Sequence, residues 1–272
     1  MKKLANVKDF GRIIHAFNDF RFTKSSQFGN KYGHDYSKFE RFELEFRNKS
    51  FSITACDGFF LVKGAFSAEI FEEKSFDISV KEKLTKSLCI NDLSDEIYFE
   101  ESKPNASSIK GNLISGKRVF VAYDTGKSFT DFPFRKNENF TVNNFFDSLV
   151  KVFNKDYLEA LNYRKNMDNE ELTFEDNNFY ITVNKNGLVL KDLSRDKTLQ
   201  ASIKNSENIE EEINFYLNKW MLYRVLKLFS TYKIDDITFF LDNKTDNNFI
   251  RVDVCIEGKN LLGIIAGAVK CK

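Results

Sequence analysis

Residues 43–54 read ELEFRNKSFSIT, and residues 171–182 read ELTFEDNNFYIT. Six positions of the two stretches coincide without a gap, and each stretch alternates apolar and polar residues on both sides of a polar turn. Alternation with a period of two predicts a β-hairpin with one buried face. Because the copies lie 128 residues apart in a chain of 272 residues, they indicate two similar domains in tandem.

Length and composition favour a globular protein of two domains. A chain of 272 residues is long enough for each domain to bury its own core. The four cysteines, at positions 56, 89, 255 and 271, form no close pair, so we expect reduced thiols and a cytosolic protein. The N-terminal stretch MKKLANVKDF lacks the apolar run of a signal peptide, and no stretch reaches about 18 apolar residues, so we expect no membrane partner.

The rest of the chain repeats one order of elements. Helical stripes of apolar residues predict four amphipathic helices, at residues 7–18, 79–88, 143–165 and 217–230. Between them lie alternating stretches that predict strands. We expect an α+β protein of two tandem duplicated domains, each with two helices packed on antiparallel sheets. The polar stretch with Pro133 predicts a linker, which gives a first domain at 1–125, a linker at 126–139 and a second domain at 140–272.

None of the motifs typical of enzymes is complete. The stretch DTGKS (124–128) resembles the end of a phosphate-binding loop, but Val121 occupies the position where that loop needs glycine. His15 and His34 lack partners at metal-ligand spacing. Asp235, Asp236, Asp242, Asp246 and Asp253 fit strand starts and turns better than a magnesium site. We therefore expect no enzymatic activity, no metal and no cofactor.

The positive charge is concentrated on the predicted helices. They carry a surplus of seven positive charges, although the net charge of the chain is only +1. This distribution suits a protein that holds a polyanion by its backbone without reading its sequence, but lysines and arginines also simply solvate the outer faces of helices. Both interpretations stay open. The candidate DNA-facing residues are Lys8, Arg12, Lys81, Lys83, Lys86, Lys151, Lys155, Arg164, Lys165, Lys219, Arg224 and Lys227.

Several segments together resemble one known family. ITACDGFFLV (53–62) is similar to a strand-turn-strand segment built on Ala-Thr-Asp-Gly, and SFTDFPF (128–134) to a Phe-Pro segment between domains. Residues 213–241, 248–254 and 261–270 resemble a last half-domain with its C-terminal tail. In their order and spacing these segments resemble the DNA sliding clamps, in particular the bacterial DNA polymerase III beta subunit.

The resemblance implies a DNA clamp fold and a role in DNA replication. Clamps of this family close a six-domain ring, with sheets outside and two helices per domain lining a hole around duplex DNA. A two-domain chain then implies a homotrimer rather than a dimer, closed head to tail through sheet edges. The implied protein is a processivity factor of the cytoplasm and nucleoid that binds double-stranded DNA without sequence preference.

The resemblance also implies a hydrophobic pocket for short peptides of the polymerase and the clamp loader. In the family the residues after the turn glycine are polar and basic, whereas here they are Phe59 and Phe60, for which ordinary strand packing is an equal interpretation. The family's Met-Pro-Met tail is Ala266-Gly267-Ala268 here, so the peptide preference need not be the usual one. The implied walls are Cys56, Gly58, Phe59, Phe60, Leu61, Pro133, Ile265, Ala266, Gly267, Ala268 and Val269.

Two other functions stay open. A clamp-fold scaffold or protein-binding module without a DNA role would have the same architecture, and an acidic helix face would favour it. An enzyme would need a convergent set of polar residues in a pocket, which the sequence does not indicate.

Overall fold

The computed structural model describes most of the chain, as two compact units. The described residues are 1–20, 41–56, 60–80, 84–102, 108–124, 138–164, 173–204, 209, 211–233, 236–241, 249–256, 259–266 and 269–270. The first unit comprises residues 1–132 with 255–261, and the second comprises residues 133–254 with 262–272. The division after residue 132 falls within the segment 126–139 that the sequence predicts as a linker.

The first unit alternates single helices with runs of strands. Its helices are α1 (Phe10–Asn18) and α2 (Lys86–Asp92). Its strands are β1 (Lys2–Asn6), β2 (Arg41–Arg47), β3 (Ser50–Cys56), β4 (Phe60–Ser67), β5 (Glu69–Ile70), β6 (Lys74–Ser79), β7 (Glu96–Glu101), β8 (Ile109–Ser115) and β9 (Arg118–Tyr123).

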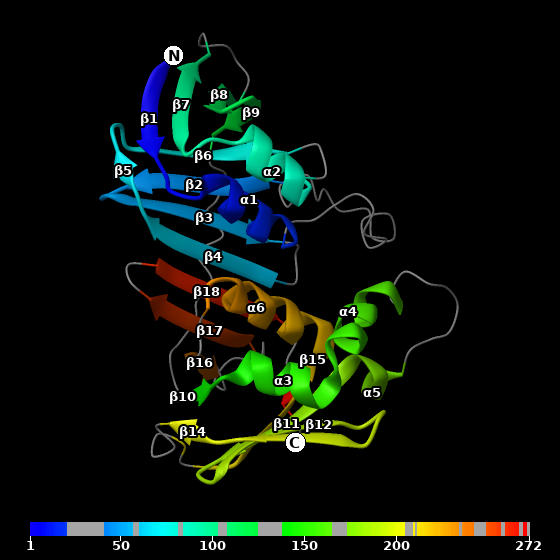
Figure 1. Ribbon diagram of the computed structural model, residues 1–272. Coiled ribbons are helices and arrows are strands. Elements are labelled where there is room, and N and C mark those ends of the chain that lie inside the picture. The colour runs from blue at the N-terminus through cyan, green and yellow to red at the C-terminus, as the bar shows by residue number, and fades with distance from the viewer. Residues whose placement is uncertain are drawn as a thin grey trace. The chain divides into compact units, whose positions relative to one another are not determined.

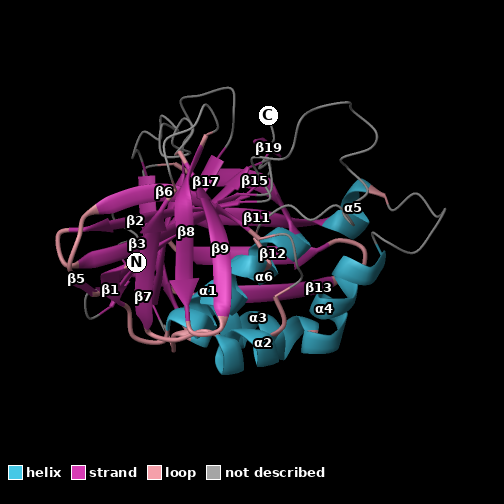
Figure 2. Cartoon of the chain, turned by 90° about the horizontal axis from the view of Figure 1, so that it is seen from above, coloured by secondary structure: helices cyan, strands magenta, loops and turns pink. Residues whose placement is uncertain are grey.

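These strands form an antiparallel sheet in the order β4-β3-β2-β6-β9-β8-β7-β1-β5. Strands β7, β8 and β9 run side by side in Figure 2. Helix α1 lies across the sheet beside β3 and contacts α2 (Figure 1). The two helices of this unit are therefore neighbours on one side of its sheet.

The hairpin predicted at residues 43–54 is confirmed. Strands β2 and β3 pair across a turn at Asn48 and Lys49, which both have positive φ, at 51° and 59°. Two such residues match the twist of a hairpin's strands. Phe46 and Phe51 face each other in the core with ring centroids 5.1 Å apart, and Phe10 of α1 packs edge-on against Phe51 at 5.6 Å. The alternating residues thus bury one face of the hairpin under α1.

The second unit repeats this order with extra helical segments. Its helices are α3 (Phe145–Phe153), α4 (Lys155–Arg164), α5 (Phe174–Asn177) and α6 (Lys219–Thr231). Its strands begin with β10 (Glu138–Asn143), β11 (Asn178–Asn184), β12 (Gly187–Asp192), β13 (Lys197–Ala201), β14 (Ile203–Lys204) and β15 (Ile213–Asn218). The remaining strands of the chain are β16 (Asp236–Leu241), β17 (Phe249–Ile256), β18 (Lys259–Ala266) and β19 (Val269–Lys270).

The sheets of this unit have the same neighbours as those of the first. One runs β14-β10-β16-β17 and the other β13-β12-β11-β15-β19. Strand β11 lies between β12 and β15, as β2 lies between β3 and β6. A left-handed residue joins the first strand of each unit to its first helix, Asp9 with φ 61° and Asn144 with φ 47°. The predicted duplication is therefore present in the fold.

The predicted register of the repeat is wrong. The segment 171–182 does not form a hairpin, because Phe174–Asn177 is a short helix that Thr173 caps. The Thr173 hydroxyl accepts from the Asp176 backbone N–H, and the Asp176 carboxylate accepts from the Thr173 backbone N–H, a capping box that favours a helical turn. The true counterpart of β2 is β11, which begins at Asn178 as β2 begins at Arg41, a period of 137 residues rather than 128.

Two of the predicted helices have different bounds. Helix α2 begins at Lys86, because Thr85 caps it by accepting a hydrogen bond from the Leu88 backbone N–H. The helix predicted at 143–165 is two helices, separated at Asn154, whose φ of 66° interrupts the helical backbone. Within the described part of the chain, no helix is long and apolar enough to cross a membrane.

Candidate nucleic-acid interface

The helices of the first unit are held together by close backbone contact. A Cβ atom added at Gly11 of α1 would overlap the carbonyl oxygen of Cys89 in α2, so the two helices approach at a position that only glycine fits. Arg12 and Lys86 are exposed on these helices, and Lys8 is exposed just before α1. Burial raises the pKa of the Cys89 thiol to about 11, which makes it an inert core residue.

In the second unit, three helices contact one another. Helix α6 packs against both α3 and α4 (Figure 1). The ring of Phe146 on α3 stacks on that of Tyr223 on α6, with centroids 5.9 Å apart. Three of the predicted DNA-facing residues are exposed on these helices: Lys151, Lys155 and Lys227.

Lys219 is not a surface residue, which corrects the prediction that it faces DNA. Its side chain has no exposed surface, and its Nζ lies 2.6 Å from the buried carboxylate of Asp192. Tyr157 and Ser194 donate to the same carboxylate at 2.8 Å each. Lys219 is the first residue of α6, directly after β15, and its side chain is fully buried. Lys219 therefore fixes α6 to α4 and to the end of β12.

The pKa values of the groups in this buried cluster are shifted from their ordinary values. Burial lowers the pKa of Lys219, against the opposing effect of its hydrogen bond to Asp192. Burial alone would raise the pKa of Asp192, but the hydrogen bonds from Lys219, Ser194 and Tyr157 outweigh it and hold that pKa below its ordinary value. Burial and the bond to Asp192 raise the pKa of Tyr157 to about 12. A buried carboxylate with these donors is stable as an ion pair.

Arg224 is also largely buried, which corrects a second prediction. Only 9% of the residue is exposed, and its guanidinium lies 4.1 Å from the ring centroid of Trp220, one turn earlier on α6. An arginine guanidinium over an indole ring forms a favourable cation–π contact. Arg224 therefore contributes to packing at the surface of α6 rather than to an open basic face.

The exposed charges on the described helices are almost balanced. On the described residues of α1, α2, α3, α4 and α6, with their cap residues and Lys8 just before α1, exposed cations exceed carboxylates by one. The exposed cations are Lys8, Arg12, Lys86, Lys151, Lys155 and Lys227, and the carboxylates are Asp9, Asp19, Asp147, Asp156 and the half-exposed Glu159. The predicted Lys81, Lys83 and Lys165 lie outside the described residues, and Arg164 is described only as a helix position.

The turn after β12 adds two cations that the sequence prediction missed. Arg195 is exposed, and its guanidinium lies 3.4 Å from the ring centroid of Tyr157 on α4. Lys197 donates at 3.3 Å to the carbonyl oxygen of Val152 in the last turn of α3. The turn thereby brings two positive charges next to the junction of α3 and α4. The sequence offers only Arg195 and Lys197, on either side of Asp196, as a signal, because the contact depends on folding.

The same fold occurs in solved structures, although no protein-family model and no curated protein sequence matches this chain. A protein described as a DNA polymerase III beta subunit of Eubacterium rectale superposes with a TM-score of 0.65 at 12% identity, over 100% of this chain and 66% of that one. The DNA polymerase III beta subunit of Thermotoga maritima gives 0.60 at 15% identity, over 99% and 65%. A DNA polymerase sliding clamp of Pseudomonas aeruginosa gives 0.59 at 13%, over 98% and 65%. The chain has the fold of a DNA sliding clamp.

The clamp fold accounts for nearly all of this chain but for only part of those proteins. The chain spans about two thirds of their length, between 65% and 66% for the three structures above. At identities of 12% to 15%, the likeness establishes the architecture and leaves the side chains of any functional surface to be judged from this chain itself. The resemblance seen in the sequence is thereby confirmed at the level of fold.

The peptide pocket expected of a clamp stays a prediction. Leu61 on β4 is 4% exposed and belongs to the core of the first unit. Cys56 ends β3 and Phe60 begins β4, while Ile265 and Ala266 end β18 and Val269 begins β19; only the backbone is described at these five positions. The other predicted wall residues, Gly58, Phe59, Pro133, Gly267 and Ala268, lie outside the described residues.

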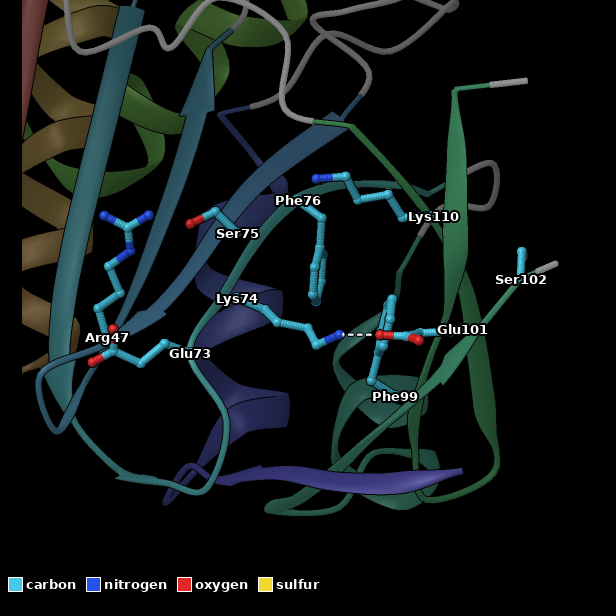
Figure 3. A pocket seen from close by; sticks show the side chains of 9 residues that line it. All are labelled: Arg47, Glu73, Lys74, Ser75, Phe76, Phe99, Glu101, Ser102 and Lys110. Carbon is cyan, nitrogen blue, oxygen red and sulfur yellow. Dashed lines mark hydrogen bonds and ion pairs between the residues drawn. The ribbon is translucent and has the colours of Figure 1, made fainter. Parts of the chain in front are cut away.

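A separate cavity of about 620 Å³ opens in the first unit. Figure 3 shows Lys74 reaching across it to Glu101, with an Nζ–Oε1 distance of 2.6 Å. The rings of Phe76 and Phe99, which also line the cavity, stack with centroids 5.2 Å apart. Both rings are under 5% exposed, so a ligand would meet mainly the mixed charges of the rim. In the part of the chain that the structure describes, no group of acidic, histidine or cysteine residues could hold a metal ion.

Proposed function

We propose that this protein is a DNA sliding clamp, a processivity factor that encircles duplex DNA and tethers a polymerase. The observation that carries the proposal is the clamp fold across 98% to 100% of the chain. In each unit the helices lie together and carry exposed lysines or arginines, as a surface facing a polyanion requires. In this role the protein works on the nucleoid in the cytoplasm and catalyses no reaction.

The near balance of exposed charge on the described helix residues is compatible with this role. A protein that neutralises many phosphates binds DNA tightly, and its affinity falls steeply with salt. A closed ring does not need tight binding to phosphates, because its topology keeps it on the DNA. Weak sequence-independent contacts then allow the ring to slide. A tethered polymerase then gains a high effective concentration at the primer end. The few exposed cations, such as Lys151 and Lys155, supply the weak contacts.

The ring would close through unpaired strand edges. Strand β13 is the outermost strand of its sheet among the described strands. In the first unit, the pairs that the described residues form between β6 and β9 involve Val121–Tyr123 of β9, so the earlier part of β9 is the part proposed to meet another copy. Val119 in this stretch is 60% exposed. Since unpaired edges template pairing with another chain, β9 of one copy and β13 of the next are the proposed contact.

Three copies of this two-unit chain supply the six domains of such a ring. The mass of the particle in solution, measured by light scattering at micromolar concentration, tests this assembly. We expect three protomers for the native chain, and smaller species for Val119→Glu, which places a charge at the proposed contact. Ile90→Glu is the matched control, since Ile90 is 58% exposed and belongs to α2 rather than to β9; it should leave the trimer intact. A native monomer would contradict the ring.

The proposed partners are those of a clamp. Besides DNA and its own copies, the protein would bind short peptides of a polymerase and of a clamp loader at the predicted pocket. With Phe59 and Phe60 in place of polar and basic residues, we propose a more apolar peptide than the usual one. Binding of tail peptides from the cognate polymerase, with Phe60→Ala as the variant, tests this part separately from the ring.

One observation favours a second function. On the described residues of α1, α2, α3, α4 and α6, with their caps and Lys8, exposed cations exceed carboxylates by only one, and Lys219 and Arg224 are buried. A clamp-fold scaffold that binds proteins but not DNA would show the same balance. It predicts a trimer or smaller assembly with no measurable affinity for duplex DNA at low salt, whereas the clamp predicts weak, salt-dependent affinity.

A further inference from the structure

One carboxylate occupies the space between two of the exposed lysines. Glu159 lies on α4, and its Oε1 accepts from Tyr223 of α6 at 3.0 Å. The same oxygen lies 3.4 Å from Nζ of Lys227 on α6 and 3.9 Å from Nζ of Lys155 on α4. A single acceptor oxygen therefore serves both lysines and joins the two helices. Lys155, Glu159 and Lys227 are 60%, 39% and 51% exposed in their side chains, so solvent and ligands reach all three.

The arrangement resembles the way in which a phosphate oxygen is bound. Two ammonium groups and one hydroxyl converge on one anionic oxygen, the donor set expected for a phosphate of DNA. Burial alone would raise the pKa of Glu159, but the hydrogen bond from Tyr223 and the charge of Lys227 lower it, so the carboxylate is ionised at neutral pH. As long as Glu159 holds the two ammonium groups, they contribute little net attraction to a polyanion.

We propose that Glu159 is an internal competitor for DNA phosphate that weakens the grip of α4 and α6, an inference that rests on the proposed clamp function. Lys155 and Lys227 exchange between Glu159 and passing phosphates. Because the carboxylate is always within reach, no phosphate is held long, and the ring moves along the duplex with low friction. Tyr223, 2% exposed, positions the carboxylate by its hydrogen bond and does not itself contact DNA.

Glu159→Gln tests the proposal, because the amide oxygen still accepts from Tyr223 while the negative charge is lost. We would measure affinity for a fluorescent linear duplex over a series of salt concentrations. Releasing two lysines should make log K fall with log[salt] more steeply by about 1 to 2, and should tighten binding several-fold at low salt. Adding Lys227→Gln should remove about half of the gain. The melting temperature should change little, which separates this role from a structural one.

Asp147→Asn is the matched control. Asp147 is exposed on α3, and its substitution changes the net charge by the same amount without releasing either lysine. It should leave the slope nearly unchanged. If Glu159→Gln and Asp147→Asn give equal slopes, only net charge matters and the proposal is overturned. If the native chain and both variants fail to bind duplex DNA at low salt, the clamp function itself is contradicted; native binding without a gain in Glu159→Gln contradicts this inference alone.

Discussion

Lys219 shows how far a single residue can be interpreted from its neighbours. It was expected on a DNA-facing helix, because α6 carries three cations and no acid in the sequence. The burial pattern of β15 continues into the helix at every second residue, through Ile213, Phe215, Leu217 and Lys219. This alternation can be seen in the sequence, and it predicts that the side chain of Lys219 points inward. The partner Asp192, 27 residues away, was not predictable, since nothing local marks it as buried.

Lys219→Met should destabilise the protein strongly. The substitution keeps the length of the side chain but leaves the buried carboxylate of Asp192 without its cation, a loss of about 3–5 kcal/mol in the free energy of unfolding. Urea unfolding monitored by circular dichroism measures it. Lys227→Met is the control, because Lys227 is 51% exposed and an exposed ion pair contributes about 0–1 kcal/mol. Equal effects of the two substitutions would contradict a buried ion pair at Lys219.

At the scale of elements, alternation was the dependable signal and local caps were the source of error. The hairpin of β2 and β3 followed from its pattern, since burial of one face fixes the register. The pattern at 171–182 misled, because Thr173 and Asp176 form a capping box and turn the first half into α5. The helical pattern of apolar residues continues across Asn154, so the sequence does not mark the break between α3 and α4 at this residue. The predicted basic surface included the buried Lys219 and Arg224, because the charges on the helices were counted before the inward faces of the helices were known.

At the contact of α1 with α2, two effects of opposite sign act on the stability of Gly11→Ala. Helix propensity alone says that Gly11→Ala stabilises the protein by roughly 0.8–1 kcal/mol. The added Cβ would overlap the backbone carbonyl oxygen of Cys89, and a backbone atom cannot move aside at little cost. We therefore expect a loss of about 1–3 kcal/mol, measured as a lower midpoint in urea. A gain in stability would mean that the two helices are not in close contact at Gly11.

At the scale of the whole molecule, the main feature is the duplication of one unit. In both units a left-handed residue lies between the first strand and the first helix. Both units also contain a central hairpin, formed by β2 and β3 in the first and by β11 and β12 in the second. The sequence indicated the duplication through segments that turned out to be out of register, and the sliding-clamp fold confirms the architecture they pointed to. Encirclement of DNA depends on how several copies of the chain assemble. The sequence pattern of a single chain does not contain this information.

Encirclement is tested most directly by blocking the ends of DNA. The protein would be loaded at low salt on a linear duplex with biotin at both ends, streptavidin would be added to one sample, and both would be diluted into high salt. Screening by salt removes most of the electrostatic contribution to binding. A ring is retained on the blocked duplex and lost from the open one. Equal, rapid loss from both samples would contradict a protein that encircles DNA.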